Sequence, residues 1–258
     1  MLRSFAQSPG SKVVYIAPLK ALARERIKDW TSTGAFSETL NKNVVELTGE
    51  TTIDSTEIEK TDILITTPEK FDGISRQWRS RAYVQQISLV VIDEIHLLGT
   101  ERGAILEVIV SRLRILSQFT SRNIRIVGLS TALANAHDLA SWLGIERIGL
   151  FNFPSSVRPV PLRIHISGYP GKAYCPRMAG MNKPTYGAIM QHSHQKPVMV
   201  FVSSRRQTRL TALDLIAFSA ADGNARKWLS MSEDELESVQ MTTKDEHLKN
   251  MMSFGIGE

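Results

Sequence analysis

The chain has 258 residues, of which 42% are hydrophobic and 22% charged, and its formal net charge is +5. This composition is typical of a globular protein and excludes a disordered or collagen-like chain. The single cysteine, Cys175, excludes an internal disulfide, and no apolar run approaches the roughly 18 residues of a membrane span.

Short apolar segments alternate with amphipathic ones through the first 150 residues. Buried strands are predicted at Val13–Ala17, Val44–Leu47, Ile63–Thr66, Ile87–Ile92 and Ile124–Leu129. Helices are predicted at Leu19–Trp30, Ala104–Phe119 and from Asn135 to Leu143, and a helical turn at Glu69–Phe71. Asn135 is the expected N-cap of the last of these helices, and Gly144 is its expected end. This alternation predicts βαβ units, a mostly parallel sheet and therefore an α/β fold.

The strand Ile87–Ile92 runs directly into two carboxylates, Asp93 and Glu94, with His96 two places later. Open α/β sheets bind their ligands at the carboxyl ends of such strands. Two adjacent acids are costly to keep half-buried unless a cation or a reacting group uses them. The pattern favours the Walker B, or DExH, box of a nucleic-acid motor driven by nucleotide hydrolysis. A strand that simply ends in solvated acids explains the same residues.

Other predicted strands also end in polar or turn-forming segments. These are Ala17-Pro18-Leu19-Lys20, Thr48-Gly49, Thr66-Thr67-Pro68-Glu69-Lys70 and Ser130-Thr131-Ala132. Each is ordinary by itself, because Thr-Pro-Glu often starts a helix, Ser-Thr-Ala is often a turn, and a basic helix face is usually solvated. Their succession at the ends of consecutive strands favours one shared site at this edge of the sheet.

A proline-rich segment, Pro154–Pro161, interrupts the alternation and predicts a linker. The expected domains are therefore 1–154 and 162–258, joined by residues 155–161. The second domain should contain strands at 162–167 and 198–202, helices at Lys183–His194, Arg205–Phe218 and Ser232–Asn250, and a final strand entering a turn at Phe254–Glu258.

Seven segments together resemble one family, the Ski2-like superfamily 2 DExH helicases. They are VVYIAPLKALARER, ELTGE, ITTPEKFDGISRQW, VVIDEIHLLGTERG, RIVGLSTALANAHDLASWL, CPRMAGMNKP and PVMVFVSSRRQTRLTA. They cover nearly the whole chain, and they look most like the second cassette of the large two-cassette members of the cointegrator-complex and spliceosomal type. The resemblance implies two RecA-like parallel-sheet domains of the P-loop NTPase type, both incomplete.

The resemblance also implies roles for the acids and for the loop after the fifth strand, with ATP and Mg²⁺ as cofactors. Asp93 would hold Mg²⁺ through water, and Glu94 would orient the water that attacks the γ-phosphate. His96, Ser130 and Thr131 would couple the nucleotide state to the grip on nucleic acid. Many relatives have Ser-Ala-Thr where this chain has Ser130-Thr131-Ala132, so one hydroxyl is displaced by one position.

Single-stranded or partly duplex RNA or DNA is the implied partner, bound with little regard to sequence, because sheet-end amides, hydroxyls and cations contact phosphates. The implied contacts are Pro18, Lys20, Arg24, Gly49, Thr67 and Lys70 in the first domain, with Ser203, Ser204 and Arg205 in the second. Relatives of this type act in the nucleus or the cytoplasm, and the same localisation is expected here. Subunits of a cointegrator-type or ribosome-rescue complex are expected as possible partners, and a membrane is not.

No G-x-x-x-x-G-K-[ST] phosphate-binding loop occurs in the chain, and the one Gly-Lys pair, Gly171-Lys172, follows Ile166 rather than the required glycine. In relatives this loop lies upstream of the first strand, and arginine-bearing motifs follow the last residues. We therefore expect a partial copy of a helicase, with weak or absent ATP binding and no helicase activity alone. A non-hydrolytic nucleic-acid-binding or assembly module remains an alternative. A Rossmann-type enzyme is excluded, because no G-x-G-x-x-G follows a strand.

Overall fold

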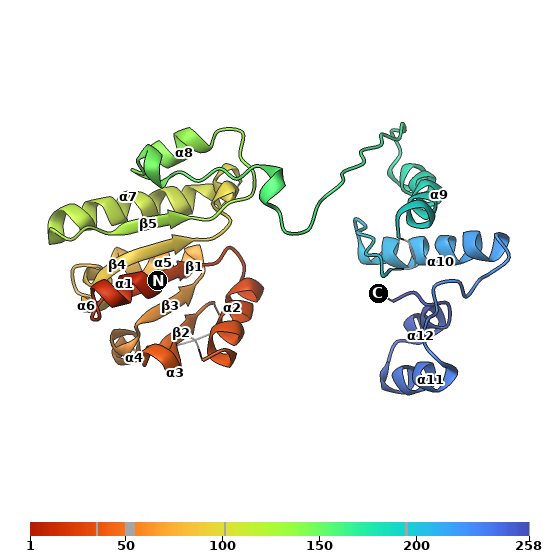
Figure 1. Cartoon of the computed structure of the whole chain (residues 1–258), viewed down its shortest axis with the longest axis horizontal. Coiled ribbons are helices and arrows are strands. Elements are labelled where there is room, and N and C mark those ends of the chain that lie inside the picture. The colour runs from red at the N-terminus through yellow and green to blue at the C-terminus, as the bar shows by residue number, and fades with distance from the viewer. Residues whose placement is uncertain (35, 50–54, 101, 194–195, 258) are drawn as a thin grey trace. The chain divides into compact units, whose positions relative to one another are not determined.

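The computed structural model describes residues 1–34, 36–49, 55–100, 102–193 and 196–257. The chain divides into two compact units, Met1–Pro161 and Leu162–Glu258 (Figure 1). Within the described ranges, no helix is both long enough and apolar enough to cross a membrane.

The first unit is built on five parallel strands in the order β2-β3-β1-β4-β5. The strands are β1 (Lys12–Ile16), β2 (Val44–Leu47), β3 (Ile63–Thr66), β4 (Ile87–Ile92) and β5 (Arg125–Gly128). Each begins and ends within one residue of its predicted range. The predicted α/β fold with a parallel sheet is therefore confirmed for this unit.

Helices lie between consecutive strands in the sequence, as βαβ units require. They are α1 (Leu2–Gln7), α2 (Lys20–Ser32), α3 (Ser37–Leu40), α4 (Ser55–Lys60), α5 (Pro68–Arg76), α6 (Ala82–Gln85), α7 (Gly103–Thr120) and α8 (Ala136–Trp142), with 3₁₀ turns η1 (Ile95–Gly99), η2 (Arg147–Gly149) and η3 (Ser155–Val157). The predicted N-cap is confirmed, because the Asn135 side chain accepts a hydrogen bond from the Asp138 amide. Gly144 ends that region with a φ of 71°.

Helices cover both faces of the sheet, and because successive side chains of a strand point to opposite faces, each central strand contributes to both packed layers. One face packs Val14, Val90 and Ile92 against α5 and α7. The other packs Val13, Tyr15, Ile63 and Val91 against residues of α1 and α2. A strand that is covered on both sides has a nearly continuous apolar sequence, and this is why these strands could be predicted.

A partly buried ion pair joins α5 to α7. Arg112 donates to Asp72 Oδ1 over 2.8 Å and to Ser75 Oγ over 2.7 Å, while Arg76 donates to Asp72 Oδ2 over 2.7 Å. The Asp72 and Arg112 side chains are only 13% and 17% exposed. Burial raises the pKa of Asp72, but the hydrogen bonds from Arg76 and Arg112 outweigh it and hold the pKa below its ordinary value.

Replacing Asp72 with Asn should lower the free energy of unfolding by about 1–3 kcal/mol, because it leaves the Arg112 cation half-satisfied. Since the folded pKa is depressed, the contribution of Asp72 is fully present above about pH 4 and disappears as pH falls through the folded value. The gap between wild type and Asp72→Asn in urea unfolding should therefore narrow in acid. Glu107→Gln, on the exposed side of α7, is the control; a pH-independent gap would contradict the ion-pair account.

The second unit is helical in its described residues. Its helices are α9 (Tyr174–His192), α10 (Arg205–Ala221), α11 (Glu233–Thr242) and α12 (Glu246–Met252). A buried polar chain joins α9 to α10, in which Asn182 donates to Asp214 over 2.6 Å and accepts from Thr211 over 3.1 Å. The predicted α10 is confirmed, and the polar C-terminal helix is divided in two by Thr243–Asp245.

The strands predicted at 162–167 and 198–202 are wrong, since the described residues there form neither helix nor strand. Ile166 and Phe201 are 92% and 87% exposed. Two short apolar runs do not make a stable parallel sheet, which needs further strands beside them and layers on both faces. Residues 253–255 form a turn instead of the predicted final strand, and Glu258 lies outside the described residues.

Helix α9 begins nine residues before the predicted start at Lys183, and the predicted end, His194, lies outside the described residues. Two prolines obscured this helix in the sequence. Pro176 lies in the first turn, where the missing amide hydrogen has no helical partner to lose. Pro184 lies in the helix interior, where tertiary packing rather than local preference sustains the helix.

Candidate nucleotide and nucleic-acid site

The carboxyl ends of all five strands meet at one edge of the sheet. The chain leaves β1 toward the β3 side and later leaves β4 toward the β5 side, so the direction of winding reverses between β1 and β4. Open parallel sheets bind ligands at such a switch point. The loop that starts at Pro18 and the acids Asp93 and Glu94 flank it directly.

Asp93 and Glu94 form a tight turn at the end of the central strand β4. The Asp93 amide donates to the Ile16 carbonyl over 2.9 Å, which fixes the start of the turn against β1. The Glu94 amide donates to Asp93 Oδ1 over 3.0 Å. Glu94 has a φ of 51°, in the left-handed region that non-glycine residues adopt at a cost. This turn directs the Glu94 carboxylate outward, where its side chain is 39% exposed.

Tyr15, a residue that sequence reasoning missed, holds the second oxygen of Asp93. The parallel register pairs Tyr15 with Val91, so Asp93, two residues further along, lies on the same face. The Tyr15 hydroxyl donates to Asp93 Oδ2 over 2.5 Å. Burial, and then this hydrogen bond, raise the pKa of Tyr15 well above its ordinary value, so the phenol stays protonated as a donor.

His96 and the loop after β5 lie beside the same turn. His96 Nδ1 is 3.3 Å from Glu94 Oε2 without hydrogen-bond geometry, and within the described part of the chain this buried nitrogen has no hydrogen-bond partner. The Ile95 amide donates to the Leu129 carbonyl, which brings Ser130 and Thr131 next to the acids. The Ser130 hydroxyl donates to the Thr131 carbonyl over 2.8 Å. All five residues predicted to act on ATP therefore gather at one place.

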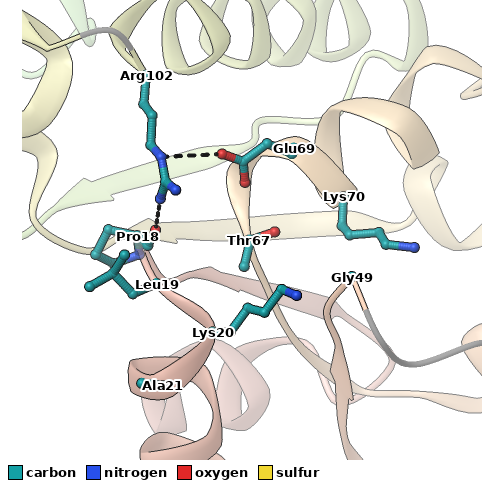
Figure 2. A pocket seen from close by; sticks show the side chains of 9 residues that line it. All are labelled: Pro18, Leu19, Lys20, Ala21, Gly49, Thr67, Glu69, Lys70 and Arg102. Atoms are coloured by element: carbon teal, nitrogen blue, oxygen red, sulfur yellow. Dashed lines mark hydrogen bonds and ion pairs between the residues drawn. The ribbon is translucent and has the colours of Figure 1, made fainter.

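A pocket of about 630 Å³ opens at the ends of β1, β2 and β3 (Figure 2). Five of the six predicted nucleic-acid contacts of this unit line it: Pro18, Lys20, Gly49, Thr67 and Lys70. Leu19, which lies inside the predicted stretch from Pro18 to Lys20, lines it as well, whereas Ala21, Glu69 and Arg102 complete the lining and were not predicted. The backbone of Gly49 approaches the Lys20 side chain so closely that an added Cβ would lie 3.1 Å from Lys20 Nζ.

Among the described residues that line the pocket, three are cations and one, Glu69, is a carboxylate. Arg102 donates to the Pro18 carbonyl over 2.5 Å, and its Nε lies 3.6 Å from Glu69 Oε1. Figure 2 shows the Glu69 carboxylate turned toward Arg102 and away from Lys70. Glu69 and Arg102 lie inside segments that carried the resemblance, in TPEK and GTERG, so the motifs held a signal for them.

The remaining predicted contacts lie elsewhere. Arg24 does not line the pocket, and its Nε is 3.9 Å from Glu46 Oε1. In the second unit, Ser204 is the N-cap of α10, where its side chain accepts from the Gln207 amide. Ser203 contacts the Tyr174 hydroxyl, and Arg205 is the exposed first residue of the helix. These three residues form a compact polar helix start within their own unit.

The acids fit magnesium chemistry. Mg²⁺ is usually held by one or two carboxylates, several waters and substrate phosphates, rather than by a cage of protein ligands. Asp93, kept as an oriented carboxylate by Tyr15 and the Glu94 amide, suits a contact through water. Within the described residues no three His, Cys, Asp or Glu side chains cluster as metal ligands. A magnesium ion here would accordingly depend on phosphate oxygens for much of its coordination.

Comparison with known proteins agrees with this geometry. The model of the DEAD/DEAH box helicase family matches residues 1–139, more than half of the chain. Over 257 residues the chain is 59% identical to human activating signal cointegrator 1 complex subunit 3 and 59% identical to the Arabidopsis thaliana DExH-box ATP-dependent RNA helicase DExH14. These matches cover 100% of this chain and 12% of each relative, so the chain spans about an eighth of their length.

Solved structures show the same fold. The helicase MrfA superposes with a TM-score of 0.58 over 95% of this chain and 36% of its own, at 18% sequence identity. The DNA-bound form of MrfA gives a TM-score of 0.58 over 93% of this chain and 35% of its own. The resemblance to DExH helicases seen in the sequence is confirmed. The chain belongs to the DEAD/DEAH box helicase family.

Proposed function

We propose that these residues form part of an ATP-dependent nucleic-acid motor, in which Asp93 and Glu94 serve ATP hydrolysis and the pocket of Figure 2 holds the phosphates of a single strand. One observation carries the proposal. The acids and the cationic pocket lie on the two sides of the same strand end, β1, at the switch point of the sheet. A change in nucleotide state at the acids can therefore affect the bound nucleic acid through the short stretch of backbone at the end of β1.

Each residue has a distinct task in this proposal. Mg²⁺ would supply positive charge that neutralises phosphate charge when the nucleotide is present. Asp93, oriented by Tyr15, would hold that ion through water. Glu94 accepts a hydrogen bond from the attacking water and takes its proton. His96 lies close to the Glu94 carboxylate, so its position depends on that of the Glu94 side chain. Ser130 and Thr131 lie beside the same turn, where a movement of Glu94 can displace them.

The 258 residues alone are not expected to hydrolyse ATP, because their sequence contains no G-x-x-x-x-G-K-[ST] loop to bind the β- and γ-phosphates. Single-strand binding needs no such loop and can be tested directly on this chain. RNA or DNA, as single or partly duplex strands, is the proposed partner. Binding should be insensitive to base sequence, because the pocket offers cations, a hydroxyl and backbone groups rather than base-reading side chains.

Changing both Lys20 and Lys70 to Ala should weaken single-strand binding about 10-fold at low salt. It should also flatten the slope of log K against log salt by about 1.4, since each lost phosphate contact removes about 0.7 from the slope. The measurement is fluorescence anisotropy with labelled mixed-sequence RNA and DNA over a range of salt concentrations.

The matched control for this double variant is Lys227→Ala with Lys244→Ala, which removes the same charge from the second unit, outside the pocket. If the chain is instead a non-hydrolytic binding or assembly module, we expect the same strand binding. In that case the ATP turnover of a longer polypeptide should not depend on Glu94. If the two double variants weaken binding equally and flatten the slope equally, the pocket of Figure 2 is not the strand site.

A further inference from the structure

Glu69 is an unexpected residue in a pocket that binds phosphates. It lines the pocket together with Lys20, Lys70 and Arg102, and its side chain is 45% exposed. A carboxylate beside a phosphate chain is repelled by it, so on charge alone Glu69 weakens binding. Its contact with Arg102 provides a structural reason for its presence.

Arg102 joins the two walls of the pocket. Its Nη1 donates to the carbonyl of Pro18, in the loop after β1, and its Nε faces Glu69 on α5, which follows β3 (Figure 2). The planar guanidinium presents its donors in a fixed fork, so one side chain can hold both partners at a set separation. Lysine, a single point donor on a flexible stem, lacks this geometry.

Arg102 also connects the pocket to the acids. It is the N-cap residue of α7, eight residues after Glu94 in the chain. Residue 101 lies outside the described residues, and local turn bonds are present near both ends of the connection, where the Leu97 amide donates to the Glu94 carbonyl and the Gly103 amide donates to the Thr100 carbonyl. Helix α7 continues from this point into the buried core with Leu106, Ile109 and Leu113.

We propose that Glu69 and Arg102 form a clamp that sets the width of the strand-binding pocket and ties it to the segment following Asp93-Glu94. Arg102 is a positioning residue in this arrangement, and its role is to hold the Pro18 loop and α5 at a fixed distance rather than to neutralise a phosphate. The clamp deepens the proposed function and rests on it. It assigns a purpose to Glu69, the acid among the described lining residues.

Two variants separate the clamp from simple charge. Glu69→Gln removes a negative charge, so a charge-only pocket should bind a single strand more tightly. The clamp predicts binding about 3- to 10-fold weaker, with an unchanged salt slope. Arg102→Lys keeps the positive charge, so a direct phosphate contact should survive, whereas the clamp predicts a loss similar to that of Arg102→Ala. In neither arginine variant should the slope fall by the 0.7 expected for a lost phosphate contact.

A second measurement requires no nucleic acid. Hydrogen exchange of the Ala23 amide, which donates to the Leu19 carbonyl over 3.1 Å at the start of α2, should become faster in Glu69→Gln, although among the described residues Glu69 is linked to the Pro18 loop through Arg102. Glu107→Gln, an equal loss of charge on α7 outside the pocket, should change neither exchange nor binding. Tighter binding by Glu69→Gln, full binding by Arg102→Lys, or unchanged exchange would each overturn the clamp. Failure of the wild-type chain to bind any single strand, with faster exchange in Glu69→Gln, would instead refute the proposed function and retain the clamp.

Discussion

Glu94→Gln is expected to lower ATP turnover by roughly 10²–10⁴-fold, the range that general base catalysis contributes. Gln has the size and shape of Glu but cannot take a proton from the attacking water. The Glu94 side chain is partly exposed and is directed by a left-handed backbone turn rather than by buried packing, so the substitution should leave the turn in place. ATP affinity should change little, because Asp93 and the phosphate contacts are retained.

The substitution is tested in a longer polypeptide that carries these 258 residues together with a phosphate-binding loop, by single-turnover hydrolysis and by nucleotide titration. The 258-residue chain serves as the blank, and Glu107→Gln serves as the charge-matched control on the exposed side of α7. Loss of ATP binding in parallel with turnover would show that Glu94 acts in binding rather than in catalysis. Turnover by the 258-residue chain itself, abolished by Glu94→Gln, would refute its expected inactivity.

The sheet and the acids were predictable because their signals are local. The three central strands, β1, β3 and β4, are buried on both faces, so their residues form nearly unbroken apolar runs, whereas the edge strands β2 and β5 are only partly buried. In a parallel sheet all carboxyl ends share one edge, so the polar residue after any strand is placed without knowledge of the strand order. Asp93, Thr67 and Pro18 could be assigned to a single site on this basis alone.

The contacts between these residues were not predictable from the pattern. The bond from Tyr15 to Asp93 requires that β1 and β4 be neighbours in a particular register, which apolar runs do not specify. The contact of Arg102 with Glu69 joins residues that are 33 positions apart in sequence. Arg102 lies at the start of α7 and Glu69 at the start of α5. Such pairs depend on tertiary packing, and the motif letters show only that both residues are present.

The second unit shows the opposite failure. Apolar runs at 162–167 and 198–202 met the local criteria for strands, yet a strand is stable only beside other strands. In the described residues the helix pair α9 and α10 carries the packing instead, through the buried Asn182 and Thr211. Local pattern therefore identifies what can be a strand, and the presence of neighbours decides whether it is one.

Gly103→Ala should lower the free energy of unfolding of the first unit by about 2–4 kcal/mol, because the new methyl group has no room. A Cβ at this position would lie 1.7 Å from the Leu98 carbonyl oxygen and 2.6 Å from the Leu98 carbonyl carbon. The backbone of Gly103 is not in the left-handed region, so the requirement for glycine here is one of close approach. Either η1 or the first turn of α7 must move to accept the methyl group.

That movement would displace Arg102, the preceding residue, so single-strand binding should weaken together with stability. Gly73→Ala in α5 is the matched control, because a Cβ there has no described atom within 4 Å and alanine favours a helix interior by up to about 1 kcal/mol. Urea unfolding and strand binding of both variants provide the test. Gly103 lies between η1, which follows Asp93-Glu94, and the rest of α7. A stable Gly103→Ala chain with intact strand binding would therefore mean that η1 can move at little cost in free energy. The connection from Asp93-Glu94 to the pocket would then be too compliant to transmit a change at the acids.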